Sequence, residues 1–142
     1  NFKKINDFTN VDISCTASIY QIMEIYDLFE SFFELNCKFD ASIVQTPKYI
    51  NPSIIMFDFK KETIKDFQIT DELILNKTGT FSLNAKKWFD YIVDYVKNTK
   101  LNYNQFNRFL IYRKKSDEIW GQNFNDYFKN YQIENDELIR VK

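Results

Sequence analysis

Three stretches near the start of the chain have the hydrophobic and polar patterns of a strand, an amphipathic helix and a second strand. Small and β-branched residues dominate Val11–Ser18, as in a strand that other elements cover. Apolar residues recur at three- and four-residue steps in Gln21–Leu35, with carboxylates on the opposite side. Lys38–Thr46 has the pattern of a second strand, which Pro47 ends. This order predicts a βαβ unit with parallel strands.

The sequence after Pro47 is expected to be mainly helical. We predict a brief helix over Lys60–Phe67, whereas 69–81 has no clear periodicity. A longer helix is expected to begin near Ser82 or Asn84, because either side chain can cap a helix.

The C-terminal part is predicted to contain two further helices. One runs from about Asn104 toward Ile119, and Gly121 would end it as a left-handed residue. A shorter helix is expected over Asn123–Tyr131, with Phe124 pointing inward. The chain is therefore expected to be an α/β unit followed by a helical region, divided into residues 1–68 and 69–142.

The composition limits the possible partners. The chain has 142 residues, of which 44% are hydrophobic and 18% aromatic, enough for one domain with a core of its own. A net charge of -1 gives no overall attraction to nucleic acid. No apolar run approaches the roughly 20 residues that a membrane span requires, and the polar N-terminal stretch lacks the pattern of a signal peptide. We expect a cytoplasmic protein that binds neither nucleic acid nor membrane.

The chain offers few groups for catalysis. It contains no histidine, which leaves carboxylates, lysine or tyrosine as general bases. Its two cysteines, Cys15 and Cys37, are isolated and lack the spacing of metal ligands, so we expect no metal site. The candidate carboxylates are Asp12, Asp40, Asp58, Asp117 and Glu118.

The carboxyl ends of the two predicted strands are the favoured place for a ligand, because ligands of parallel α/β proteins collect there. Ser18 and Gln21 offer a hydroxyl and an amide at the first strand end, and Thr46 offers a hydroxyl at the second. Backbone groups freed by Pro47 could hydrogen-bond a planar ligand edge. These four residues are the candidate cofactor-binding set. The alternative is that Ser18 only caps the following helix.

Three segments together resemble the later part of a radical S-adenosylmethionine enzyme with a twitch-type extension, a kind often carried by phages and marine bacteria. Thr16–Gln21 is similar to a family strand that ends in Ser-x-x-Asn. Pro47–Lys60 is similar to Pro-x-Tyr-Leu, an apolar run, Leu-Pro and a lysine that opens a helix. Lys115–Phe124 is similar to Asp-x-x-Arg-Gly-x-x-Phe. The chain differs from these patterns at Gln21, Met56 and Trp120.

The resemblance implies a partial (β/α) barrel, whose last parallel strands and crossover helix lie in residues 1–68 and whose helical extension lies in 69–142. Family members hold a 4Fe–4S cluster through a Cys-x-x-x-Cys-x-x-Cys loop, which this sequence lacks. The cluster and most of the S-adenosylmethionine site would then belong to a missing N-terminal half of the same protein. Ser18 and Thr46 would lie near S-adenosylmethionine, and the chain alone would be an inactive fragment of an enzyme with an unknown substrate.

Two other functions compete with this hypothesis. The chain could be a complete, non-catalytic α/β module that binds a protein partner through its aromatic-rich faces. A small hydrolase or transferase with carboxylate catalysis ranks below both.

Overall fold

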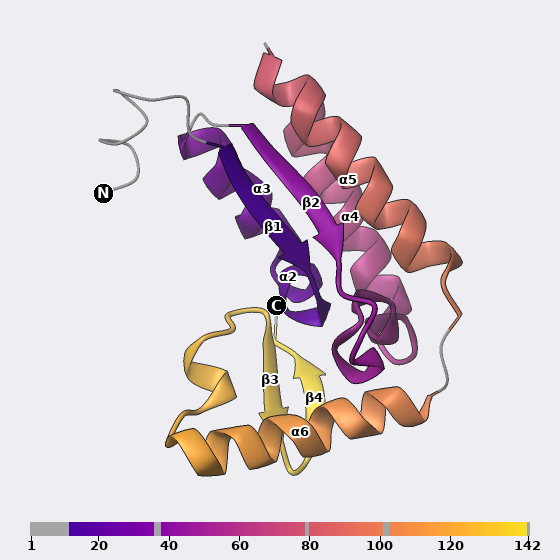
Figure 1. Cartoon of the computed structure of the whole chain (residues 1–142), viewed down its shortest axis with the longest axis vertical. Helices are drawn as coiled ribbons and strands as arrows, with labels where there is room; N and C mark the ends of the chain where they lie inside the picture. The colour runs from indigo at the N-terminus through magenta and orange to yellow at the C-terminus, as the bar shows by residue number, and fades with distance from the viewer. Residues whose placement is uncertain (1–11, 36–37, 79, 101–102, 142) are drawn as a thin grey trace.

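A parallel pair of strands forms the first part of the fold. The computed structural model describes residues 12–35, 38–78, 80–100 and 103–141. Strands β1 (Asp12–Ala17) and β2 (Lys38–Ile43) lie side by side in register, and both point the same way in Figure 1. The predicted parallel arrangement is confirmed. The strands are shorter than expected, because pairing ends before Thr46, and Val11 lies outside the described residues.

The connection between the strands contains two helices instead of the one predicted. Helix α2 (Ile19–Met23) and helix α3 (Ile25–Leu35) meet at Glu24, whose φ of -123° and ψ of 33° leave the helical region. The Glu24 carboxylate accepts hydrogen bonds from the backbone N–H groups of Lys129 and Asn130 at 3.0 and 3.1 Å. Burial raises the pKa of the Glu24 carboxyl, and these two N–H donors oppose the shift. The break between α2 and α3 therefore coincides with a contact to residues more than a hundred positions later in the sequence.

The core of this part is built from aromatic rings. The side chains of Ile25, Phe29 and Phe32 recur at helical spacing on α3 and are buried, as the amphipathic pattern predicts. The Phe29 ring makes edge-to-face contacts with Phe39 of β2 and with Phe89, at centroid distances of 5.4 and 5.5 Å. These contacts join the crossover, the sheet and a later helix into one core.

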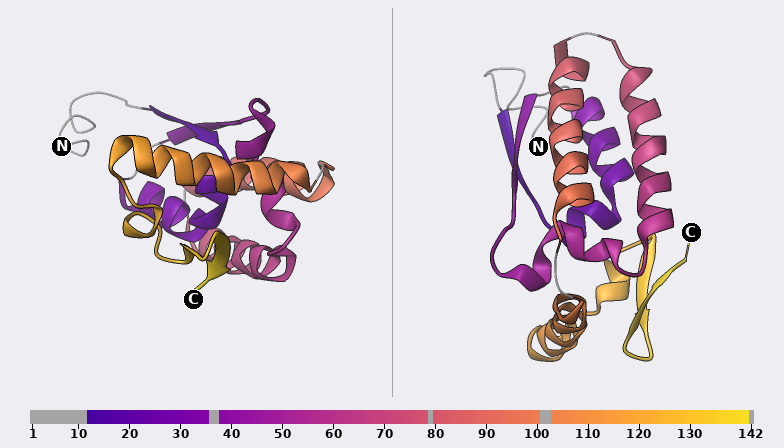
Figure 2. Two further views of the ribbon diagram at one scale, coloured as in Figure 1. Left: turned by 90° about the horizontal axis from the view of Figure 1, so that it is seen from below. Right: turned by 90° about the vertical axis from the view of Figure 1, so that its right-hand side faces the viewer.

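Two long helices complete the layer that covers the sheet. Helix α4 (Lys60–Leu75) and helix α5 (Thr80–Asn98) pack against each other, and α5 also packs on β2. Figure 2 shows α3 and α5 on one face of the strand pair, with α4 beyond them. The short 3₁₀ helices η1 (Lys48–Ile50) and η2 (Pro52–Met56) connect β2 to α4.

Both long helices differ from their predicted bounds. Helix α4 extends past Phe67 to Leu75, across the expected division between residues 68 and 69. Helix α5 begins at Thr80, so the prediction that Ser82 or Asn84 caps it is wrong. The Asn84 side chain instead accepts a hydrogen bond from the backbone N–H of Phe39 at 3.0 Å. This bond ties α5 to β2.

The C-terminal part contains a hairpin that the sequence pattern did not predict. Helix α6 (Asn104–Trp120) has almost the predicted extent, but the next helical element, η3 (Phe124–Asp126), is only a 3₁₀ turn. Strands β3 (Tyr131–Glu134) and β4 (Glu137–Arg140) then pair antiparallel. The helix predicted over Asn123–Tyr131 is therefore mostly wrong. Because the two residues of the hairpin turn adopt positive φ, an Asn-Asp pair suits it.

Polar contacts fasten this hairpin to the rest of the fold. Arg140 of β4 donates two hydrogen bonds to the Asp66 carboxylate of α4, at 2.5 and 2.7 Å. Its guanidinium also lies over the ring of Tyr131, 4.8 Å from the centroid. The Asp66 and Arg140 side chains are only 13% and 18% exposed, so water screens the pair weakly.

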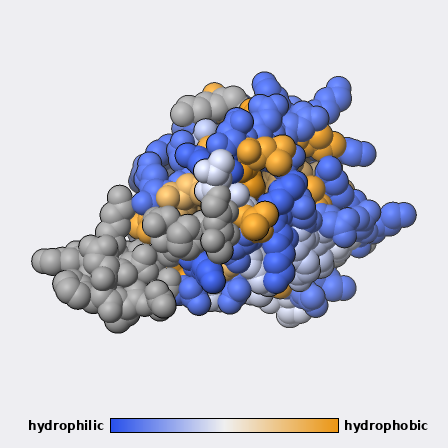
Figure 3. All heavy atoms as spheres, turned by 90° about the horizontal axis from the view of Figure 1, so that it is seen from above, coloured by the Kyte–Doolittle hydropathy of each residue, from blue (hydrophilic) through white to orange (hydrophobic). Residues whose placement is uncertain are grey.

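The described residues thus form an α/β protein that is mostly helical, with one parallel and one antiparallel strand pair. At the end of the molecule where β1 and β2 begin, hydrophilic residues dominate the described surface, and hydrophobic ones form small patches (Figure 3). Among the described residues, no helix has the length and apolar character needed to cross a membrane.

Candidate functional site

The parallel arrangement brings the two predicted strand ends to one edge of the sheet. Ala17 lies opposite Ile43 at the last paired position, and the Val44 N–H donates to the Ala17 carbonyl at 2.9 Å. Ser18 follows β1 directly, and Thr46 lies three residues after the end of β2. The candidate residues therefore lie on two chain segments that are next to each other in space.

Ser18 has the capping role that the sequence left as an alternative. Its hydroxyl accepts the Tyr20 N–H at 3.3 Å and donates to Gln21 Oε1 at 2.6 Å. Gln21 Oε1 also accepts the Ser18 N–H at 2.9 Å, which completes a capping box at the start of α2. Because Ser18 is buried and its hydroxyl proton is used internally, this side chain is better suited to position Gln21 than to donate to a ligand.

Gln21 keeps one polar group available. The Gln21 amide oxygen is held by the capping box, whereas its NH₂ group makes no hydrogen bond with any described residue. An amide NH₂ is a double donor. Gln21 can therefore offer two N–H groups to a ligand acceptor such as a carboxylate, a carbonyl oxygen or a ring nitrogen.

The segment after β2 is held by an asparagine that the sequence analysis did not single out. Asn51 is buried, and its side-chain amide donates to the Val44 carbonyl at 2.9 Å and to the Tyr95 hydroxyl at 2.8 Å. Its side-chain oxygen accepts the Ser53 N–H, so it also caps η2. Thr46 is exposed and Pro47 is half-buried within this loop. An asparagine directly before Pro52 was the available signal, because Asn caps helices and Pro favours their first position.

The face of the β1–β2 pair that lies opposite the helices is polar. Every second residue of each strand is exposed there: Asp12, Ser14, Thr16, Lys38, Asp40 and Ser42. Thr16 and Ser42 lie opposite each other, and their hydroxyls hydrogen-bond at 3.2 Å. None of the described elements covers this face in Figure 2. Two of the candidate carboxylates, Asp12 and Asp40, thus share one surface.

Asp117, another candidate carboxylate, has a structural role at the end of α6. Its carboxylate pairs with Arg113 and accepts the Phe124 N–H at 3.0 Å. Gly121 ends the helix in the left-handed conformation, with φ of 61°, as predicted. The Asp-x-x-x-Gly-x-x-Phe spacing in this sequence therefore stabilises a helix terminus and the turn after it. Trp120, which stands where the family pattern has arginine, is 72% exposed.

Replacing Gly121 by alanine is expected to lower the free energy of unfolding by about 1 kcal/mol, because a Cβ is unfavourable at positive φ. An added Cβ would meet no atom within 4 Å, so backbone strain is the main expected effect. Thermal or urea unfolding measures the change. Gly121→Asn should lower the free energy of unfolding by less than Gly121→Ala does, since asparagine tolerates positive φ better than alanine. Equal losses in both variants would contradict the explanation.

The cysteines give no sign of a metal centre within the described part of the chain. Cys15 is half-buried, and burial raises the pKa of its thiol, which lowers its reactivity. Cys37 lies outside the described residues. No group of three or more Cys, His, Asp or Glu side chains in the described ranges has the arrangement of a metal site.

The fold and the strand ends together define an α/β protein with a candidate ligand site at the carboxyl edge of a parallel strand pair. No protein-family model, no curated protein and no solved structure matches the chain.

Proposed function

We propose that this chain is part of a radical S-adenosylmethionine enzyme in which β1 and β2 belong to a (β/α) barrel. The observation that carries the proposal is the combination of a parallel, in-register strand pair with one helix-covered face and one polar face. Parallel sheets are normally covered on both faces. A face of three hydroxyls, two carboxylates and one ammonium group suits the lining of a barrel interior that contains a polar ligand.

The open edge of β1 supports the same proposal. In the described residues β1 pairs only with β2, so the other edge of β1 has no strand neighbour, whereas Asn84 of α5 takes the Phe39 N–H on the outer edge of β2. Unpaired edges invite further strands. Additional parallel strands at the edge of β1 would extend the pair into a barrel wall, and they would come from chain upstream of Asn1.

In such an enzyme the cofactors would supply the radical chemistry, and this chain would help to bind S-adenosylmethionine. The 4Fe–4S cluster would be held by a cysteine loop upstream, since the described residues hold no suitable cluster of ligands. Reductive cleavage of S-adenosylmethionine would supply the radical. Of this chain's residues, Gln21 would donate its amide N–H groups to S-adenosylmethionine, and Ser18 would fix the orientation of Gln21. Thr46 and Pro47 would border the ligand from the β2 side.

Replacing Gln21 by glutamate in the full-length protein separates ligand binding from folding. Glutamate can still complete the capping box, because its carboxylate oxygen accepts the same two Ser18 donors. It loses the NH₂ donors and adds a negative charge. We expect S-adenosylmethionine to bind about tenfold more weakly, as when a hydrogen bond to a ligand is lost, while the melting temperature stays nearly unchanged. Calorimetric titration and thermal unfolding measure the two quantities.

Three further variants complete this test. Gln68→Glu makes the same chemical change on an exposed position of α4 and should leave affinity unaltered. Ser18→Ala should lower both stability and affinity, because it breaks the capping box. Thr46→Val tests the β2 side. Unchanged affinity in the Gln21, Ser18 and Thr46 variants would remove these residues from the site.

The reading frame upstream of Asn1 tests the enzyme class itself. A Cys-x-x-x-Cys-x-x-Cys segment there would support the proposal, and an iron–sulfur spectrum of the purified full-length protein would test it directly. A start codon immediately before Asn1 would instead favour a non-catalytic interaction module. One observation favours that alternative: Ile119 and Trp120, at the end of α6, are 74% and 72% exposed.

A further inference from the structure

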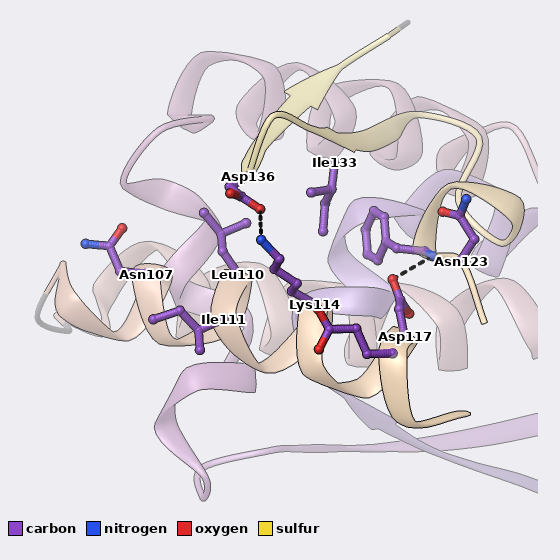
Figure 4. Close-up of a pocket in the computed structure, with 10 residues that line it drawn as sticks. Asn107, Leu110, Ile111, Lys114, Asp117, Asn123, Ile133 and Asp136 are labelled. Carbon is purple, nitrogen blue, oxygen red and sulfur yellow. Dashed lines mark hydrogen bonds and ion pairs between the residues drawn. The ribbon is translucent and has the colours of Figure 1, made fainter. Parts of the chain in front are cut away.

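A cleft lies between α6 and the β3–β4 hairpin, away from the strand ends of β1 and β2. Its volume is about 640 Å³, within the roughly 300–1,000 Å³ range of small-molecule sites. Its apolar wall consists of Leu110, Ile111, Phe124 and Ile133. In Figure 4 Leu110 approaches from the helix and Ile133 from the hairpin, and Lys114 extends between them toward Asp136. We call this space the α6 cleft.

The charged groups that line the α6 cleft are mostly acidic. They comprise one ammonium group, on Lys114, and three carboxylates, on Asp117, Glu118 and Asp136. Lys114 pairs with Asp136 at 2.9 Å, and Asp117 is engaged by Arg113 and by the Phe124 N–H. The hydrogen bond to Asp136 raises the pKa of Lys114 and the nearby charge of Glu118 adds to that shift, but Glu118 itself makes no hydrogen bond or ion pair with another described residue. One carboxylate therefore remains available beside an apolar wall.

The edge of β3 that faces η3 is closed to a peptide strand. Asn125 of η3 donates its side-chain N–H to the Ile133 carbonyl at 3.1 Å and accepts the Ile133 N–H at 2.7 Å. These two bonds occupy the backbone groups that an added strand would use. A ligand in the cleft must therefore be recognised by side chains rather than by strand pairing.

We propose that the α6 cleft binds a small organic amine. Its apolar body would contact Leu110, Ile111 and Ile133, and its protonated amino group would pair with Glu118. The apolar contacts supply most of the affinity, since they remove hydrocarbon surface from water. Glu118 supplies the preference for a cation, because its carboxylate makes no ion pair with a described residue and its neighbour Lys114 is already paired with Asp136. This site does not depend on the function proposed for the strand ends.

Three probes with the same apolar body and different head groups test the proposal: 4-phenylbutylamine, 4-phenylbutan-1-ol and 4-phenylbutanoate. Each is titrated into the ¹⁵N-labelled chain, and amide shifts report both the affinity and the location. We expect the amine to bind about two- to fivefold more tightly than the alcohol, as for a partly exposed ion pair, and the acid to bind most weakly. The shifts should concentrate in residues 107–118 and 133–136.

Substitutions in the cleft separate the charge from the apolar wall. Glu118→Gln should abolish the preference for the amine over the alcohol, whereas Glu30→Gln, on the exposed side of α3, should preserve it. Ile111→Ala should weaken all three probes by a similar factor, roughly two- to fivefold, and leave their order unchanged. Because Ile111 is 56% exposed, this variant should fold normally.

Four results would overturn the proposal. They are equal affinities for the three probes, no saturable binding of the amine, shifts confined to other parts of the molecule, and an amine preference that persists in Glu118→Gln.

Discussion

Replacing Phe29 by alanine is expected to lower the free energy of unfolding by about 3–5 kcal/mol, the range for truncation of a buried phenylalanine. Phe29 is fully buried and contacts the rings of Phe32, Phe39 and Phe89. Its removal would leave a cavity between α3, β2 and α5. Urea unfolding followed by circular dichroism measures the loss.

Two companion variants make this result interpretable. Phe29→Leu keeps most of the volume and should lose only about 1–1.5 kcal/mol, so a folded protein remains if the alanine variant unfolds. Phe57→Ala removes a ring that is 37% exposed and should lose clearly less than Phe29→Ala. A Phe29→Ala loss as small as that of Phe57→Ala would contradict the central position of this ring.

Replacing Asp66 by alanine is expected to destabilise the chain by about 2–3 kcal/mol, somewhat below the range for fully buried ion pairs. The reason is that the Arg140 guanidinium would lose its carboxylate partner in a site that is only 18% exposed. Asp71→Ala breaks the pair between Asp71 and Lys86, whose side chains are each 36% exposed. That variant should lose less than about 1 kcal/mol.

The double variant Asp66→Ala with Arg140→Met tests whether the loss in Asp66→Ala comes from the unpaired guanidinium. Removing both charges leaves no buried guanidinium without its partner, so this variant should be more stable than Asp66→Ala alone. Thermal unfolding of the unaltered protein, Asp66→Ala, Arg140→Met and the double variant gives the coupling energy between the two residues. If the double variant is the least stable of the set, the loss in Asp66→Ala arises from packing instead of charge.

Elements with strong local patterns were predictable from the sequence. The parallel strands follow from the strand–helix–strand order and from small and β-branched residues, the buried stripe of α3 follows from hydrophobic periodicity, and the end of α6 follows from Gly121. These features depend on residues that are near one another in the chain. The conformational preference of glycine and the apolar spacing of an amphipathic helix need no distant partner.

Features that depend on distant contacts were not predictable. The break between α2 and α3 lies at Glu24, whose hydrogen-bond partners are more than a hundred residues away. Asn84 was predicted as a helix cap from its residue type, but its side chain accepts a hydrogen bond from the backbone N–H of Phe39 in β2. The hairpin of β3 and β4 had a usable signal, since Asn135 and Asp136 form a two-residue turn between alternating residues. The aromatic residues before it favoured a helix instead.

The candidate site was predictable in outline only. Ser18, Gln21, Thr46 and Pro47 were chosen because ligands of parallel α/β proteins collect at the carboxyl ends of strands. The structure brings their segments to one edge of the sheet. The sequence could not reveal which polar atoms remain available, because that depends on the capping box and on the Asn51 bonds. The polar face of the sheet was also missed, although the alternation of Ser14 and Thr16 with apolar neighbours was visible.

The bonds from Glu24 to Lys129 and Asn130 have a consequence for the order of folding during synthesis. The first crossover connection cannot be completed until residue 130 has left the ribosome, so the nascent N-terminal half must persist with this corner unfinished. Pulse-labelling of stalled nascent chains should therefore show late protection at the amides of residues 129 and 130, together with the turn around Glu24.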